Sequence, residues 1–133
     1  MLKIFGAKVS FSSRLSATAF ISCPKNFEIG YNSSIGDDCY LQCLDKIIIG
    51  QNVCISDKVT ILTGYHDLND HNFALVTSSV KLYDYVWVAY GAAILPSSEL
   101  KQNCIIGAFS LVKGTYGDGS LISGNPARII KKN

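Results

Sequence analysis

One polar stretch, Thr63 to Asp70 (TGYHDLND), holds the residue types best suited to proton transfer, and the second of the chain's two histidines follows at position 71. An unperturbed histidine has a pKa of about 6.5, so His66 should be largely neutral at pH 7 and able to take a proton from a hydroxyl. Such a base is usually oriented by a carboxylate or carbonyl group on its other ring nitrogen. Asp67 is adjacent in sequence, which is a poor geometry for a direct bond to this imidazole. We expect His71 to lie on the surface or at the rim of a site.

The five cysteines form neither a metal-binding pattern nor a disulfide pattern. Their number is odd, and the sequence has no Cys-x-x-Cys pair and no zinc-type Cys/His spacing. A zinc enzyme with three histidine ligands is also disfavoured, because only two histidines are present. We therefore expect no metal, and reduced thiols that act as small apolar fillers. These thiols belong to Cys23, Cys39, Cys43, Cys54 and Cys104.

The composition indicates one domain spanning 1–133 that associates with itself. The formal charge of +2 does not indicate a nucleic-acid or anionic membrane partner. Charged residues make up 17% of the chain and apolar residues 48%, so a monomer would expose much apolar surface. No apolar run approaches the roughly 20 residues that a membrane-spanning helix needs. The first ten residues, MLKIFGAKVS, contain no continuous apolar segment typical of a signal peptide, so we expect a cytoplasmic protein.

An internal repeat predicts the elements that position the polar stretch. From position 29 onward an aliphatic residue recurs every six residues, with a two-residue shift after Leu41 and an interruption around TGYHDLND. A period of six fits neither an α-helix nor a plain strand, but it fits short strands separated by turns. Three such strands would close a triangular coil with the aliphatic side chains inward, and stacked coils would form a solenoid. A sandwich of short strands is the alternative, which the strict spacing disfavours. The twelve positions are Ile29, Ile35, Leu41, Ile49, Ile55, Ile61, Leu82, Val88, Ile94, Leu100, Ile106 and Val112.

A second column of small residues follows four positions after most of these aliphatic residues, and Asp45 and Tyr65 are its exceptions. Asp45 would lie one coil before His66 if the hexads stack. Because an unpaired buried carboxylate is unfavourable, we expect Asp45 to face a cleft. We therefore favour Asp45 over Asp67 as the acidic residue that takes part in the site.

The ends of the repeat and its interruption predict the remaining elements. Residues 67–81 are expected to form a protruding loop, with His66 at the corner where the coil ends. Residues 1–28 have a weaker six-residue pattern at Phe11, Ala17 and Cys23, which predicts a degenerate first coil or cap. Helix signals are nearly absent before Gly124, and the tail after this glycine could form a short cap.

The hexads IGYNSS and IGDDCY have the I-G-x-x-S-x pattern of hexapeptide repeats. Together with four further motifs, they give the chain a resemblance to the hexapeptide-repeat acyltransferases. Within that family it looks most like the O-acetyltransferases of colanic acid and other exopolysaccharide pathways. The motifs are Leu44-Asp45-Lys46, Thr63-Gly64-Tyr65-His66-Asp67, Val86-Trp87-Val88 and Gly124-Asn125-Pro126-Ala127-Arg128.

The resemblance implies an all-β fold, a left-handed parallel β-helix, and homotrimers with each active site between neighbouring subunits. It also implies an acetyl-CoA-dependent O-acetyltransferase that modifies a sugar hydroxyl during surface-polysaccharide synthesis. Transfer would be direct, in a ternary complex, because none of the cysteines lies in a motif typical of a covalent relay. Two alternatives stay open: an N-acetyltransferase acting on an amino-sugar nucleotide, and a non-enzymatic solenoid that serves as a scaffold.

The resemblance also implies roles for individual residues. His66 would be the catalytic base, and Asp45 would bind the acceptor, although a structural hydrogen bond at a corner is the other interpretation. Trp87 would line the cleft for acceptor and thioester, and packing between subunits is an equally good interpretation. Coenzyme A carries phosphates that require cations near its adenosine end. The implied coenzyme contacts are Tyr90, Ala108 and Lys113 for pantetheine, and Arg128 and Lys131 for the phosphates, unless the basic tail is only solvated.

Overall fold

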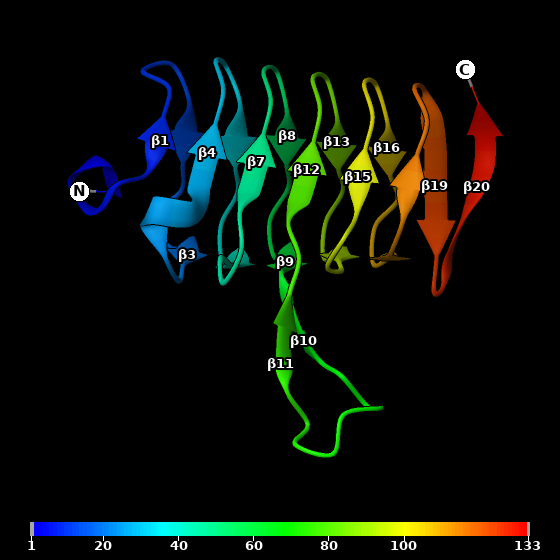
Figure 1. Ribbon diagram of the computed structural model, residues 1–133. Coiled ribbons are helices and arrows are strands. Elements are labelled where there is room, and N and C mark those ends of the chain that lie inside the picture. Colours follow the sequence, from blue (N-terminus) through cyan, green and yellow to red (C-terminus); the bar gives the residue numbers. More distant parts are fainter. Residues whose placement is uncertain (1, 133) are drawn as a thin grey trace.

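The computed structural model describes residues 2–132, which form a solenoid of short strands stacked along one axis (Figure 1). The strands make three sheets, here called A, B and C, which form three sides of the solenoid and are parallel except for the last strand of sheet B. Sheet A contains β1 (Lys8–Val9), β4 (Phe27–Ile29), β7 (Ile47–Ile49), β12 (Val80–Leu82), β15 (Glu99–Leu100) and β18 (Thr115–Tyr116). Sheet B contains β2 (Arg14–Leu15), β5 (Ser34–Ile35), β8 (Cys54–Ile55), β13 (Trp87–Val88), β16 (Ile105–Ile106), β19 (Ser120–Gly124) and β20 (Ala127–Lys132). Sheet C contains β3 (Phe20–Ile21), β6 (Tyr40–Gln42), β9 (Thr60–Leu62), β14 (Ala93–Ile94) and β17 (Leu111–Val112).

The repeated aliphatic residues fill the core. In sheet A, for example, Ile29 pairs with Ile49, Ile49 with Leu82, and Leu82 with Leu100, so like side chains stack on successive coils. All twelve predicted inward residues are buried, with at most 4% of any of them exposed. Burial of a large aliphatic side chain contributes roughly 1.5–3 kcal/mol, so this column is the main stabilising feature of the solenoid. The prediction of an all-β parallel helix is confirmed.

The predicted register of the first coil was wrong by two residues. Its inward residues are Val9, Leu15 and Ile21, which pair with the inward residues of the second coil. Phe11, by contrast, is 95% exposed and lies at a corner. The physical reason is a corner between sheets C and A that is two residues longer than the others. This extension separates Ile21 from residue 29 just as it separates residues 41 and 49.

The longer corner also explains the two exceptions in the column of small residues. At this corner the buried residues are Cys43 and Thr63, each two positions after its inward aliphatic residue. Asp45 is only partly buried and Tyr65 is 47% exposed. Of the five thiols, which are all free, Cys39, Cys43 and Cys104 are buried fillers, whereas Cys54 is exposed. The expectation of small apolar fillers is therefore wrong for Cys54.

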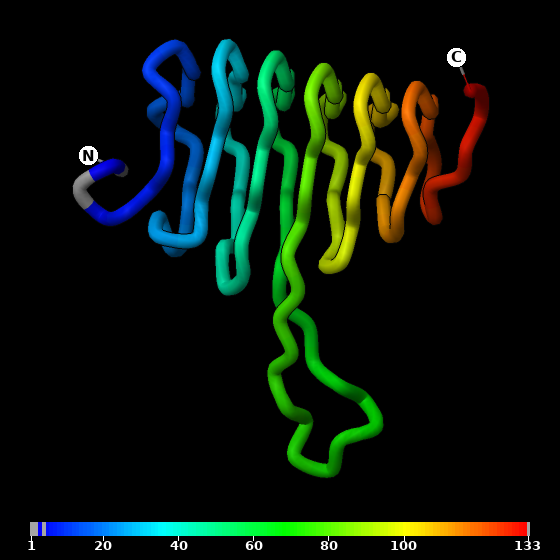
Figure 2. The backbone as a smooth tube through the Cα atoms, turned by 45° about the horizontal axis from the view of Figure 1, so that its top comes forward, coloured from blue at the N-terminus to red at the C-terminus, as the bar shows by residue number. Residues whose placement is uncertain are grey.

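An antiparallel hairpin leaves the solenoid between sheets C and A and extends away from its body (Figures 1 and 2). Its strands are β10 (Gly64–His66) and β11 (Leu75–Thr77), in which His66 pairs with Leu75. The predicted loop, 67–81, therefore begins three residues too late, because His66 already lies on the hairpin. It also ends too late, because Lys81 belongs to β12 of sheet A.

The two ends of the solenoid differ. The 3-10 helices η1 (Leu2–Phe5) and η2 (Pro24–Asn26) flank the first coil. At the other end β20 turns back antiparallel on β19, so the cap after Gly124 is a strand. None of the helices in residues 2–132 is long and apolar enough to span a membrane.

Candidate active site

His66 is fixed by a backbone carbonyl group on the opposite arm of the hairpin. Its Nδ1 lies 2.8 Å from the carbonyl oxygen of Phe73. A carbonyl oxygen can only accept a hydrogen bond, so Nδ1 carries the proton and donates it. In the neutral ring the lone pair is then on Nε2, and the His66 side chain is exposed. This tautomer is the one required of a base that takes a proton through Nε2.

The ring of Phe73 lies flat against the same imidazole. The two ring centroids are 4.5 Å apart and the ring planes differ by 4°. Phe73 therefore touches His66 twice, through its carbonyl group and through its side chain. Phe73 could not be predicted from the sequence, because an aromatic residue seven positions after a histidine forms no recognisable motif.

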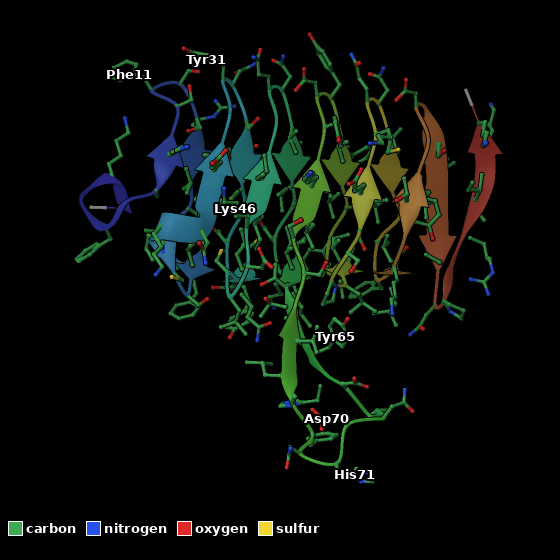
Figure 3. The ribbon with its side chains drawn as sticks, in the orientation of Figure 1. Phe11, Tyr31, Lys46, Tyr65, Asp70 and His71 are labelled. Carbon is green, nitrogen blue, oxygen red and sulfur yellow. The ribbon has the colours of Figure 1, made fainter. Side chains whose placement is uncertain are left out.

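The acidic residues of the hairpin shape its turn and do not contact His66. The carboxylate of Asp67 accepts the backbone N–H of Asn69 at 2.9 Å, and that of Asp70 accepts the N–H of Asn72 at 2.9 Å. Figure 3 shows Asp70 and His71 at the far end of the hairpin, whereas Tyr65 is nearer the solenoid. Neither Asp67 nor Asp45 orients the imidazole.

Asp45 lies at the root of the hairpin, on the corner between β6 and β7. Its backbone N–H donates to the hydroxyl of Thr63 at 3.0 Å. Its carboxylate accepts the N–H of Lys46 at 2.7 Å through one oxygen. The corner hydrogen bond expected as one of its roles is therefore present, and the other carboxylate oxygen keeps its capacity to bind a ligand.

A pocket of about 360 Å³ lies beside the hairpin root. Leu62 and Pro96 supply apolar walls, Tyr65 an aromatic ring, and Lys113 a cation. The structure thus places Lys113 at the corner between sheets C and A, on the same side of the solenoid as Asp45 and the hairpin. It does not group Lys113 with the other residues expected to contact pantetheine.

Those other residues lie on sheet B and on its corner with sheet C. Trp87 points outward from β13, is 47% exposed, and donates from Nε1 to the hydroxyl of Ser56 at 3.2 Å. Tyr90 follows at the corner, and its ring meets that of Phe109 edge-on at a centroid distance of 5.4 Å. Ala108 is exposed beside Phe109, one coil further along.

A groove of about 570 Å³ runs along the same face toward the N-terminal coils. Its wall combines apolar surface with hydroxyl groups, two carboxylates and one guanidinium, which lie beside the Tyr90 ring. The polar lining residues are Arg14, Ser16, Ser34, Asp37, Ser56 and Asp57.

Arg128 and Lys131 extend from β20, and both side chains are exposed. Arg128 donates from Nη1 to the carbonyl oxygen of Ala127 at 2.9 Å. Among the residues that the structure describes, neither cation forms an ion pair. Both can therefore bind an anionic ligand without breaking an internal salt bridge.

The residues assigned to the site thus lie in separate places on one protomer. Asp45, His66 and Lys113 lie at the corner of sheets C and A, whereas Trp87 and Tyr90 lie on the sheet-B side. The hairpin extends away from the solenoid, so it does not bring the histidine to the tryptophan of its own chain (Figure 2). A single chain therefore does not bring His66 and Trp87 into one site.

The chain is similar to acetyltransferases over nearly its whole length, although no family model matches it. It is 27% identical over 132 residues to the putative colanic acid biosynthesis acetyltransferase WcaF of Escherichia coli strain K12, over 99% of this chain and 72% of that protein. The crystal structure of a maltose O-acetyltransferase from Clostridium difficile 630 has a TM-score of 0.87 and 30% identity, over 98% of this chain and 72% of that one. The hexapeptide-repeat acetyltransferase VCA0836 of Vibrio cholerae, complexed with acetyl coenzyme A, has a TM-score of 0.83 and 20% identity. The similarity to VCA0836 covers 98% of the present chain and 72% of the VCA0836 chain, and it shows that the two share a fold.

Proposed function

The chain belongs to the hexapeptide-repeat acyltransferases of the left-handed β-helix fold, and from this premise we propose that it transfers an acetyl group from acetyl-CoA to a sugar hydroxyl. The observation that carries the proposal is the Nδ1 hydrogen bond of His66, which leaves Nε2 as an exposed base. A hydroxyl is a weak nucleophile at neutral pH and needs such a base.

The reaction proceeds directly in a ternary complex. As the sugar hydroxyl attacks the thioester carbonyl, Nε2 of His66 takes the hydroxyl proton. The tetrahedral intermediate collapses, the carbon–sulfur bond breaks, and the imidazolium returns the proton to the thiolate of coenzyme A. The carbonyl oxygen of Phe73 accepts the Nδ1–H bond throughout and stabilises the transient positive charge.

The charge distribution on the three sheets supports a homotrimer with sites between subunits. The outward residues of sheet A are largely charged, and Lys8 pairs with Glu28 at 3.3 Å. Those of sheets B and C are mainly uncharged, which favours burial against another copy. A contact of sheet B on one copy with sheet C on the next generates a closed trimeric ring when each copy is rotated by a third of a turn relative to its neighbour. The uncharged outward residues include Cys54, Trp87 and Ile105 on sheet B and Phe20, Tyr40 and Leu111 on sheet C.

Such a ring supplies a binding site for each substrate. Arg128 and Lys131 provide cations for the phosphates of coenzyme A, and Tyr90, Ala108 and Lys113 contact its pantetheine arm. The Vibrio cholerae relative is itself complexed with acetyl coenzyme A. Trp87 and the groove on sheet B provide an aromatic surface and polar groups suited to a sugar. The maltose relative favours a sugar acceptor, and the colanic acid relative favours a role in surface-polysaccharide synthesis. Use of acetyl-CoA and five free thiols are in keeping with a cytoplasmic location.

The decisive test is steady-state acetyl transfer by the purified protein against a panel of sugars, oligosaccharides, nucleotide sugars and amino-sugar nucleotides. We expect a sugar hydroxyl to be acetylated and His66→Ala to lower kcat at least 100-fold or so, the usual contribution of a general base. His71→Gln, at the exposed end of the hairpin, is the matched control and should keep wild-type activity. A correctly assembled His66→Ala variant with near-normal kcat would contradict the mechanism. Transfer to amines alone would indicate an N-acetyltransferase, and the absence of saturable acetyl-CoA binding would indicate a scaffold.

A further inference from the structure

We propose that Phe73 is the positioning residue of the catalytic base, acting through both its ring and its backbone. The inference deepens the proposed function, because it concerns the same imidazole. Its starting point is the double contact described above: a carbonyl oxygen 2.8 Å from Nδ1, and a parallel ring 4.5 Å from the imidazole. Side-chain packing alone accounts for neither the orientation nor the tautomer of His66, because the hairpin is exposed.

The backbone of Phe73 supports a functional role for this residue. Its φ of +52° is in the left-handed region, where a residue with a side chain is unfavourable by roughly 1–2 kcal/mol and glycine is not. Eight other non-glycine residues among those described have positive φ, and all of them lie at corners of the coils. Phe73 is the one that lies on the hairpin, where an asparagine or glycine would form the turn more easily.

The turn that holds Phe73 in this conformation is hydrogen-bonded along its whole length. The N–H of Phe73 donates to the carbonyl oxygen of Asp70 at 2.9 Å, and the N–H of Asp67 donates to that of Ala74 at 3.0 Å. The carboxylates of Asp67 and Asp70 close two further bonds to backbone N–H groups within the loop. The TGYHDLND stretch therefore builds a small frame that directs the Phe73 carbonyl group back toward His66.

The ring of Phe73 has no other evident task. It is 53% exposed, so it contributes little to a core, and the aromatic ring on which it stacks is that of His66. A flat aromatic face restricts rotation of the imidazole and thereby keeps Nδ1 on the carbonyl oxygen. The same face also favours the imidazolium that forms when Nε2 takes the proton, through a cation–π interaction.

The test combines ring-nitrogen NMR with kinetics on the full chain. Because the chain has two histidines, ¹⁵N-histidine labelling gives two sets of ring signals, and His71→Gln assigns them. Phe73→Gly removes the ring and still permits the left-handed backbone, whereas Phe73→Tyr keeps the ring. Leu68→Gly is the matched control, because it removes an apolar side chain that is 82% exposed from the same hairpin.

We expect the wild type, Phe73→Tyr and Leu68→Gly to show His66 protonated on Nδ1 in the neutral ring. Phe73→Gly should show a mixture of tautomers and a kcat lowered roughly tenfold, with the KM for acetyl-CoA within about twofold of wild type. A Phe73→Gly variant with the wild-type tautomer and kcat would overturn the inference, and so would an equal change in Leu68→Gly. If the wild type transfers no acetyl group, the proposed function fails, and the tautomer of His66 still decides the role of Phe73.

Discussion

At the scale of single residues, several small buried side chains form hydrogen bonds with the backbone of the neighbouring coil. Ser33 donates its hydroxyl to the carbonyl oxygen of Gly50 at 2.7 Å and accepts the N–H of Val53 at 3.0 Å. The thiol of Cys104 similarly faces the carbonyl oxygen of Gly117 at 3.2 Å. Small side chains thus satisfy backbone groups inside the corners, where an unpaired polar group would cost about 1–3 kcal/mol.

The buried thiols should make the folded protein less stable at alkaline pH. Burial raises the pKa of the Cys43 thiol from 9.0 to about 12, and burial also raises the pKa of Cys39 and Cys104. Below pH 9 both the folded and the unfolded chain hold these protons. Between pH 9 and 12 the unfolded chain loses them first, so the free energy of unfolding falls as pH rises. At pH 10 the loss from Cys43 is about 1.4 kcal/mol.

Thermal unfolding of two single variants checks this prediction. Cys43→Ala should unfold at a lower temperature than wild type near neutral pH, because it leaves a cavity, and should lose less stability between about pH 8 and 10. Cys54→Ala removes the exposed thiol and should keep the wild-type pH dependence. Identical pH dependence in all three proteins would contradict the assigned role of burial.

The same exposed thiol tests the route of acetyl transfer. Cys54 lies beside Trp87 in sheet B, close to the proposed acceptor groove. Because His66 activates the sugar directly, Cys54→Ser should retain kcat within about twofold, without an acetylated enzyme intermediate. Mass spectrometry of the wild type mixed with acetyl-CoA alone provides the measurement. Acetylated Cys54 that disappears on addition of acceptor would show a covalent relay instead.

At the scale of elements, the coil corners depend on close approach between backbones. A Cβ atom on Gly36 would lie 2.7 Å from the backbone nitrogen of Asp57 on the next coil, which is too close for a non-bonded contact. On Gly117 the corresponding atom would meet nothing within 4 Å. Glycine is therefore required at position 36 for a steric reason that does not apply at position 117.

This difference predicts the effect of two alanine substitutions. Gly36→Ala should lower the free energy of unfolding by roughly 1–3 kcal/mol, because the coils must separate locally. Gly117→Ala should change it by less than about 0.5 kcal/mol. Denaturant unfolding followed by circular dichroism measures both, and equal losses would show that the corner of Gly36 relaxes freely.

The elements also show what the sequence could and could not predict. The hexads from Ile29 to Val112 were readable because each inward position requires an aliphatic side chain. The inward residues of the first coil were predicted wrongly because the spacing of six was continued back from Ile29. The longer corner after Ile21 makes that step eight residues, and no residue type in the corner indicates the difference. His66 was predicted as the base through its motif, whereas its contact with Phe73 depends on a left-handed turn that residue types do not reveal. Which residues face each other across subunits is likewise set by assembly rather than by spacing.

At the scale of the whole molecule, the proposed ring combines His66 of one subunit with Trp87 of the next. Two inactive variants, His66→Ala and Trp87→Ala, should then complement each other when denatured together and refolded in equal amounts. A site is restored only where the subunit that supplies His66 is the Trp87→Ala variant and the subunit that supplies Trp87 is the His66→Ala variant. Each condition is met half of the time, so random assembly restores about a quarter of the sites. Recovered acetyl transfer near that fraction supports shared sites. No recovery in mixed trimers of the correct mass would show that each chain supplies both residues.

The antiparallel direction of β20 also limits the length of the structure. A solenoid of parallel coils has an unpaired strand edge at each end, which can join the complementary end of another molecule and repeat without limit. In sheet B the edge after β19 is already occupied by a strand running the opposite way. A parallel strand of a second molecule finds no continuation of the register there. The turn after Gly124 therefore prevents a second molecule from extending sheet B in parallel, which disfavours end-to-end polymerisation and favours a solenoid of fixed length.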